Sequence, residues 1–346
     1  MARRKYSAKK RNKIEPAALT MTFVIPTVGA AAQVHHIDLS QCASLLNRRF
    51  YRQGINWAVA GIKAVTTTQQ IGAQISVGML PNTWVMSNAW EKGFRAWQRM
   101  NLEALQESES VRPRFLDFKI YANKDHHAAG YGSNLLPISS ATTAAPIQLA
   151  TVGEWEPSKY VIPDTSLGAT GGVQEREVIA VGANYPGNGS SGLNAVSLIE
   201  GYAASRGLPN VLDPNTPDDA ADSDGVSPEN FLQALFNEGT QQSSDVLDVM
   251  ITENNIAPYP FENDGVNVDT MYPGGANQLA SLELHDFEVV TASTVGGTTR
   301  LKGGNFPCGL MEIQTFGYVE GSSITLQVNL VPGNHRGYLC EPMTEM

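Results

Sequence analysis

The residues with the clearest chemical potential are the basic side chains at the start of the chain. Seven of the first thirteen residues are Lys or Arg, and none of the thirteen is acidic. They are Arg3, Arg4, Lys5, Lys9, Lys10, Arg11 and Lys13. Lys and Arg on a flexible segment neutralise phosphates by counterion release and need no fixed geometry to do so. The segment is therefore predicted to bind nucleic acid without reading its sequence.

The rest of the chain has the opposite charge. The whole sequence of 346 residues has 24 Lys and Arg against 34 Asp and Glu, a formal net charge of -10. Without the seven basic residues, 17 Lys and Arg remain against 34 Asp and Glu, so a body of charge -17 carries an arm of +7. Residues 1–16 are expected to be disordered until a polyanion neutralises them, because they bury too little apolar surface to offset their ordering entropy.

Other roles for this arm follow from the same composition. Clusters of Arg and Lys also serve as nuclear import signals. A mitochondrial presequence is disfavoured because Lys is as common as Arg here and no apolar face is present; a merely solubilising tail is the other alternative. No sustained apolar stretch follows the arm and no run of about 18 apolar residues occurs, so neither a signal peptide nor membrane insertion is expected.

A second candidate site is the glycine-rich loop from Gly187 to Gly192. With Gly189 it matches the Gly-x-Gly-x-x-Gly pattern of dinucleotide-binding folds, and Asp213 follows about twenty residues later. A nucleotide-binding enzyme is thus one alternative function. Pro186 interrupts the preceding strand pattern, however, and no parallel strand is predicted beyond the following helix. We therefore favour a surface loop.

An acidic loop at residues 213–225 is the third candidate, because carboxylates can coordinate a divalent cation. The carboxylates are those of Asp218, Asp219, Asp222 and Asp224. Aligned on Gly225, the EF-hand pattern fails at Ala220 and Phe231, the first and last ligand positions. We expect a solvated loop and no cofactor, with a divalent cation shared between subunits as the alternative.

Catalytic and metal-binding patterns are otherwise missing from the sequence. His35–His36 and His126–His127 are neighbouring pairs, and neighbours on a strand point to opposite faces, so each is expected to be a surface or interface pair. No nucleophile elbow or His-Glu-x-x-His motif occurs. The three cysteines are widely spaced, which suggests neither disulfides nor zinc. The protein is expected not to be an enzyme.

The elements that must position these residues are mostly strands. Alternation of apolar and polar residues is clearest at residues 323–331, where Ile324, Leu326, Val328 and Leu330 define one face. About nine strands are predicted in all. The others lie at residues 20–28, 55–68, 71–79, 115–121, 177–183, 246–252, 284–291 and 311–316.

Three helices are expected in long connections between these strands. The first spans residues 87–109 and carries Trp90, Phe94 and Trp97 at helical spacing, a stripe better suited to the core or a subunit contact than to base stacking. The others span residues 193–206 and 227–239. Because the helices do not alternate with strands, the predicted fold is all-β: an antiparallel, eight-stranded jelly-roll β-sandwich with helices inserted in its loops. Residues 17–346 are expected to form one domain.

A basic arm followed directly by an all-β body resembles the single-jelly-roll capsid proteins of circular Rep-encoding single-stranded DNA viruses, which are circovirus-like. The resemblance is carried by the arm, by the strand at residues 114–121 and by the closing strands at residues 310–330. It implies a coat protein that assembles into an icosahedral T=1 shell of about 60 copies. The arm would face the interior and bind genomic single-stranded DNA, RNA being possible, and the protein would occur in the virion and the host nucleus; the host receptor is not identified.

The positive charge of the arms limits how much of a packaged genome they can neutralise. About 60 arms supply about 420 positive charges, which neutralise about as many phosphates, so a kilobase genome needs further cations. Mobile cations or inward-facing basic side chains of the body must provide them. A cellular all-β binding module with a nuclear localisation tail is the third alternative.

Overall fold

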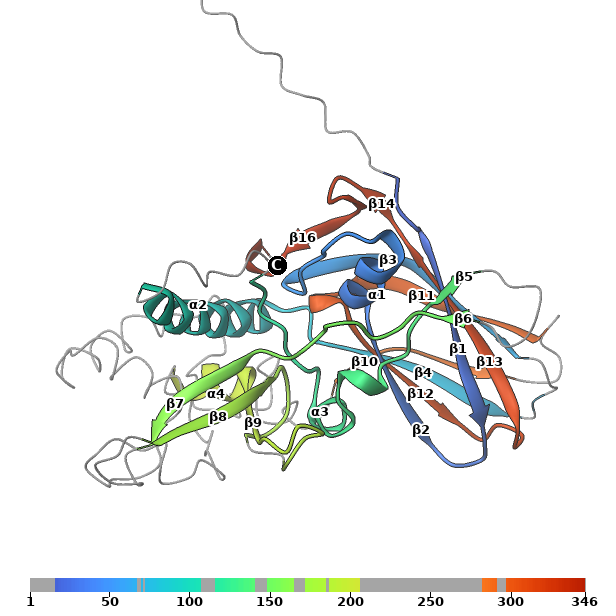
Figure 1. The fold of residues 1–346 in the computed structure, drawn as a ribbon. Helices are drawn as coiled ribbons and strands as arrows, with labels where there is room; N and C mark the ends of the chain where they lie inside the picture. Colours follow the sequence, from blue (N-terminus) through green and yellow to red (C-terminus); the bar gives the residue numbers. More distant parts are fainter. Residues whose placement is uncertain are drawn as a thin grey trace, which may run out of the picture.

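Two antiparallel β-sheets face each other in the structure, a computed structural model (Figure 1). The structure describes residues 16–66, 70, 72–106, 116–140, 148–164, 172–184, 187–205, 282–290 and 297–345. The basic arm, the acidic loop 213–225 and the predicted elements at 227–239 and 246–252 lie outside this part of the chain. The prediction of a mainly antiparallel β-sandwich with few helices is confirmed.

The first sheet has its strands in the order β1, β13, β3, β11, and a short strand, β16, also pairs with β3. The bounds are β1 Thr20–Val28, β13 Ser322–Leu330, β3 Ile55–Thr66, β11 Thr298–Phe306 and β16 Cys340–Pro342. The second sheet has the order β10, β4, β12, β2. Its bounds are β10 Glu283–Val290, β4 Ala73–Met79, β12 Leu310–Phe316 and β2 Gln33–Asp38.

Pairing in these sheets is nested. Taking these eight strands in chain order and leaving β16 aside, the first pairs with the last, β1 with β13, and the second with the seventh, β2 with β12. The third pairs with the sixth, β3 with β11, and the fourth with the fifth, β4 with β10. One apolar core lies between the sheets and takes side chains from both, among them Phe23, Trp57, Ile75, Ile313 and Leu326.

A long insertion between β4 and β10 packs at one end of the sandwich (Figure 1). Its helices are α2 Trp84–Gln106, α3 Lys124–Ala129 and α4 Leu198–Ser205, and its strands are β5 Ile138–Ser140, β6 Gln148–Leu149, β7 Lys159–Asp164, β8 Gly172–Ile179 and β9 Ala195–Ser197. A second apolar cluster joins α2 to β7, β8 and α4, and reaches Leu310 and Met343 of the sandwich. The insertion is thus continuous with the β-sandwich through its core.

The remaining elements are short. Helix α1 Leu39–Asn47 follows β2 directly, and the hairpin of β14 Pro332–Gly333 and β15 Gly337–Tyr338 precedes β16. In the described part of the chain there are also the 3-10 turns η2 Tyr131–Ser133, η6 Pro307–Gly309 and η7 Met343–Glu345.

Several predicted boundaries are wrong for identifiable reasons. Residues 116–120 are no strand: the Lys119 amide donates to Ser158 Oγ and the Ile120 amide to Gln53 Oε1, so side chains replace a neighbouring strand. The helix predicted at 193–206 begins only at Leu198, because residues 195–197 pair with β8 in parallel. The strand predicted at 177–183 begins and ends earlier, as β8.

Candidate functional site

The seven basic residues predicted to bind nucleic acid lie outside the described part of the chain, but the point from which they extend is well defined. Ala18 donates its amide to Asn47 Oδ1 at 3.0 Å and accepts a hydrogen bond from the Tyr338 hydroxyl at 2.8 Å. The Leu330 amide donates to the Leu19 carbonyl at 2.7 Å. The arm is therefore anchored beside the C-terminal end of α1 and the β15 hairpin.

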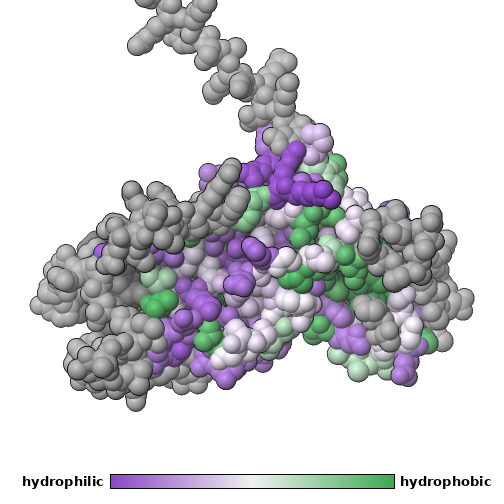
Figure 2. Space-filling model, viewed as in Figure 1, coloured by the Kyte–Doolittle hydropathy of each residue, from purple (hydrophilic) through white to green (hydrophobic). Residues whose placement is uncertain are grey.

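A basic segment that the sequence analysis missed begins at this anchor. Arg48, directly after Asn47, ends α1 in the left-handed conformation with φ 53°, and Arg48, Arg49 and Arg52 are all exposed. Figure 2 shows strongly hydrophilic side chains gathered where the described chain begins. The sequence signal was available, since three arginines surround the two aromatic residues at positions 50 and 51. Cationic side chains of the body thus lie next to the exit of the arm.

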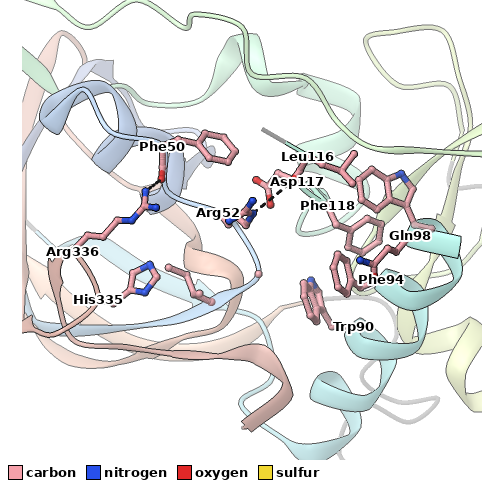
Figure 3. Close-up of a pocket in the computed structure, with 13 residues that line it drawn as sticks. Phe50, Arg52, Trp90, Phe94, Gln98, Leu116, Asp117, Phe118, His335 and Arg336 are labelled. Atoms are coloured by element: carbon pink, nitrogen blue, oxygen red, sulfur yellow. Dashed lines mark hydrogen bonds between the residues drawn. The ribbon is translucent and has the colours of Figure 1, made fainter. Parts of the chain in front are cut away.

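Beside this segment is a cavity of about 640 Å³ between the end of the sandwich and α2 (Figure 3). One wall carries Phe50, His335 and Arg336, and the opposite wall carries Trp90, Phe94 and Phe118, with Arg52 and Asp117 between them. A volume of this size is typical of sites for small organic ligands.

The α2 wall is aromatic. Trp90 and Phe94 stack with ring centroids 5.0 Å apart, and Phe118 meets Trp90 edge-on at 6.1 Å. The indole fits here because residue 54 is glycine: a Cβ at Gly54 would overlap the Trp90 ring. As predicted, Trp90 and Trp97 are buried, but they also form part of a cavity wall, which the stripe alone did not indicate.

One polar atom on this wall is unsatisfied. Trp90 is 6% exposed, and its Nε1 has no hydrogen-bond acceptor among the described residues. Burying an N–H group without a partner costs free energy, so such groups are uncommon in folded proteins. The Nε1 atom has almost no accessible surface, so the surrounding side chains enclose it and it does not face the open cavity.

The facing side is cationic. Arg52 donates Nε to the Leu116 carbonyl at 3.3 Å, and Arg336 donates Nη1 to the Phe50 carbonyl. A guanidinium has five N–H groups, so both arginines retain donors. Arg336 has φ 50°, a conformation uncommon for a residue with a side chain and typical of functional or tightly constrained positions.

Asp117 and His335, which line the cavity, have shifted pKa values. Burial raises the pKa of Asp117, although Lys119 and Arg52 oppose the shift, so its negative charge is disfavoured relative to an exposed aspartate. Burial and the neighbouring Arg336 lower the pKa of His335, which keeps this imidazole neutral near pH 7. Lys119 lies 4.9 Å from the Trp155 ring and 6.0 Å from that of Phe50.

A buried polar cluster joins β2 and β12 to the insertion, and it includes the histidines expected at the surface. That expectation is wrong for His36, His126 and His127, because all three are buried, and the second pair lies on a helix, not a strand. His36 Nε2 lies 3.1 Å from Glu312 Oε2, which also accepts from Asn123 Nδ2 at 2.7 Å. Burial alone would raise the pKa of Glu312, but hydrogen bonds from His36 and other side chains hold it below its ordinary value.

His126 has a defined tautomer within this cluster. Its Nδ1 accepts from the Ala122 amide at 3.1 Å, so the proton is on Nε2, which lies 2.9 Å from Asn134 Oδ1. Burial, assisted by the charge of His36, keeps the pKa of His126 well below the usual range. The neutral ring acts as a structural connector and, with both nitrogens engaged, has no place for a metal ion. Among the described residues no group of three potential metal ligands comes together.

The glycine-rich loop from Gly187 to Gly192 packs on α3. The Gly189 amide donates to Leu193, the Ser190 amide to His127 and the Gly192 amide to Gly189. In a dinucleotide fold such amides point at a phosphate from a helix N-terminus; here protein carbonyls accept them, and strand β9 separates the loop from α4. This geometry favours a structural loop.

No known family model, curated protein or solved structure matches this chain. The function must therefore be argued from the strand pairing, the charges and the cavity. Within the described residues, no helix has both the length and the apolar composition that crossing a bilayer requires.

Proposed function

We propose that this protein is a viral capsid protein whose eight-stranded jelly roll assembles into a closed icosahedral shell around single-stranded DNA. The arm of Arg3, Arg4, Lys5, Lys9, Lys10, Arg11 and Lys13 binds the DNA, and no catalysis is involved. The same arm serves as an import signal for assembly in the host nucleus.

The nested strand pairing is the observation that carries the proposal. When a long hairpin of eight strands wraps around a core, the first strand pairs with the last and each following strand with its counterpart, and the four pairs divide between two sheets. The orders β1-β13-β3-β11 and β10-β4-β12-β2 follow this rule. Jelly rolls with this arrangement are widespread among viral capsid domains.

The origin of the arm supports a role in packaging. Ala18, just after the arm, is held by Asn47 and Tyr338, and the exposed Arg48 and Arg49 follow Asn47 in the chain. A polyanion bound by the arm therefore meets further positive charge where the arm joins the body. The opposite charges of arm and body are useful in a shell, because nucleic acid bridges subunits whose bodies repel one another.

Exposed apolar side chains on β10, an edge strand of the second sheet, support subunit association. Leu284, Phe287 and Val289 of this strand are 67%, 44% and 42% exposed. Exposed edge strands with apolar side chains readily pair with other chains. Such a surface suits a second copy of the protein, since apolar contacts must overcome repulsion between the negative bodies.

Electron microscopy of the purified full chain tests the proposal. Closed shells of uniform diameter that protect nucleic acid from nuclease are expected, and sequencing that nucleic acid distinguishes DNA from RNA. Deleting residues 1–13 should preserve shells and abolish protected cargo. A strictly monomeric protein at all salt concentrations, with or without nucleic acid, would refute the assignment.

A further inference from the structure

We propose that the cavity between Phe50 and α2 binds a nucleotide of the packaged strand, with its base against the aromatic wall and its phosphate on Arg52 and Arg336. The inference rests on the proposed function and deepens it, since it assigns a base-binding site to the body in addition to the charge-binding arm.

The lining of the cavity selects the class of ligand. Its volume of about 640 Å³ and its rings at Phe50, Trp90, Phe94 and Phe118 suit a flat aromatic group. Stacking on aromatic side chains is the usual way in which proteins hold bases of single strands, and it tolerates any base because every base has a π face.

The arginines supply the anionic part. Arg52 and Arg336 reach the cavity from different segments, after α1 and in the β14–β15 hairpin, and guanidinium groups bind phosphate through paired hydrogen bonds. Asp117 is the acidic residue of the lining, and the nearby positive charges of Lys119 and Arg52 oppose its negative charge. The ligand is therefore an aromatic ring joined to an anion, as in a nucleotide.

Position in the fold favours a polynucleotide over a free nucleotide. Arg48 and Arg49 lie between the anchor of the arm, at Asn47, and the cavity residue Phe50. Two exposed arginines thus separate the anchor of the arm from the cavity along the chain. Arg48, Arg49, Arg52, Lys119 and Arg336 of about 60 subunits would add about 300 charges to those of the arms.

The test compares two oligonucleotides of equal charge on the full chain. Fluorescence anisotropy is measured with an oligothymidylate of about twelve nucleotides and with an abasic strand of the same length. The unmodified protein should prefer the oligothymidylate by about tenfold, the effect expected of a stacked base. Arg336→Gln removes a phosphate contact that both strands make, so it should weaken the binding of both strands and leave the preference unchanged. Phe50→Ala should reduce this preference to about twofold or less. Trp90→Phe, which keeps a ring of smaller area, should reduce it about two- to fivefold.

Arg300→Gln is the matched control, because Arg300 is an exposed arginine on β11 that does not line the cavity. It should weaken the binding of both oligonucleotides equally and leave the preference for the oligothymidylate unchanged. Circular dichroism verifies that each variant is folded. Equal affinity of the unmodified protein for the two strands overturns the inference, as does a preference that survives both Phe50→Ala and Trp90→Phe. If the protein forms shells that protect DNA but shows no base preference, base binding in the cavity is refuted and the capsid function is not. If the cavity variants change the base preference but no shells form, the capsid function is refuted and base binding is not.

Discussion

The imidazole rings of His36 and His126 lie face to face, with centroids 4.5 Å apart and planes 9° from parallel. One ring comes from β2 of the sandwich and the other from α3 of the insertion. Their stacking closes the cluster that includes Glu312 and Asn123, so the insertion is joined to the sandwich through polar as well as apolar contacts.

This stack predicts a dependence of stability on pH. The pKa of His126 in the folded state lies well below its ordinary value of 6.5, so the unfolded chain binds the proton more tightly. Stability is therefore lost as the pH falls below 6.5, by up to about 1.4 kcal/mol per pH unit for this group. Urea unfolding at pH 7, 6 and 5 should show a smaller loss for His126→Gln than for the unmodified protein. Parallel losses in the two proteins would exclude His126 as the cause.

Asp38 provides a second test of stability, and its contribution to the pH dependence of stability has the opposite sign to that of His126. Its buried carboxylate accepts hydrogen bonds from the Ser40 and Gln41 amides, Gln53 Nε2 and Trp155 Nε1. Removing the N-cap and leaving buried donors unpaired should make Asp38→Ala less stable by about 2–4 kcal/mol, measured by urea unfolding.

The charge of Asp38 can be tested separately from its hydrogen bonds. Burial raises its pKa from 3.8 to about 6 despite the four donors. The proton thus favours the folded state, and the resulting stability is present below pH 3.8 and lost as the pH rises through about 6. Asp38→Asn should lack this loss between pH 4 and 7. An unchanged pH profile would show that Asp38 does not titrate in this range.

Gly189 should be intolerant of substitution for a packing reason. A Cβ here would overlap the His127 ring, so Gly189→Ala should lower stability by about 1–3 kcal/mol. Gly132→Ala is the control, since no atom lies within 4 Å of its Cβ position and its φ is not positive. Adding NAD or ATP should change the thermal midpoints of Gly189→Ala and Gly132→Ala by the same amount. Nucleotide stabilisation that Gly189→Ala abolishes would instead support the enzyme alternative.

Phe287 on the β10 edge tests subunit association. Phe287→Lys should prevent shell formation while leaving the thermal midpoint nearly unchanged, because the side chain is 44% exposed and a charge there opposes contact between copies. Leu102→Lys on α2, 41% exposed, is the control and should still assemble. Electron microscopy and sedimentation separate these outcomes, and shells formed by Phe287→Lys would remove β10 as the interface.

The salt dependence of DNA binding tests the arm. Seven contacts predict a slope of about -5 for log affinity against log salt with single-stranded DNA. Deleting residues 1–13 should reduce the slope to the part contributed by the body. A slope that the deletion leaves unchanged would locate the charge contacts elsewhere.

Strands with regular alternation were predictable from the sequence. β1 agrees with its predicted bounds and β13 differs by one residue, because buried and half-buried positions alternate along β13. β2 was missed, since its buried His36 and Asp38 are polar, and β11 was missed because Lys302, Gly303 and Gly304 interrupt its pattern. In both strands the buried environment depends on partners distant in sequence.

The cavity and the histidine cluster could not be predicted for a related reason. His36 and His126 are separated by ninety residues and Phe50 and Arg336 by far more, so only the folded chain brings them together. Local spacing did indicate a Trp90 stripe facing the interior. It could not show that Gly54 leaves room for the indole or that its nitrogen has no acceptor.

The pairing of β1 with β13 has a consequence for biosynthesis. Thr20 lies opposite Asn329, so about three hundred residues separate partners in the same ladder. Contacts of such long sequence separation form late and slow folding. The neighbour of β1 in the sheet is β13, so β1 stays unpaired there until residues 322–330 have been synthesised. Until then the facing edges of β1 and β3 lack the strand that separates them in the folded sheet, so an unfinished chain exposes two open strand edges to other chains.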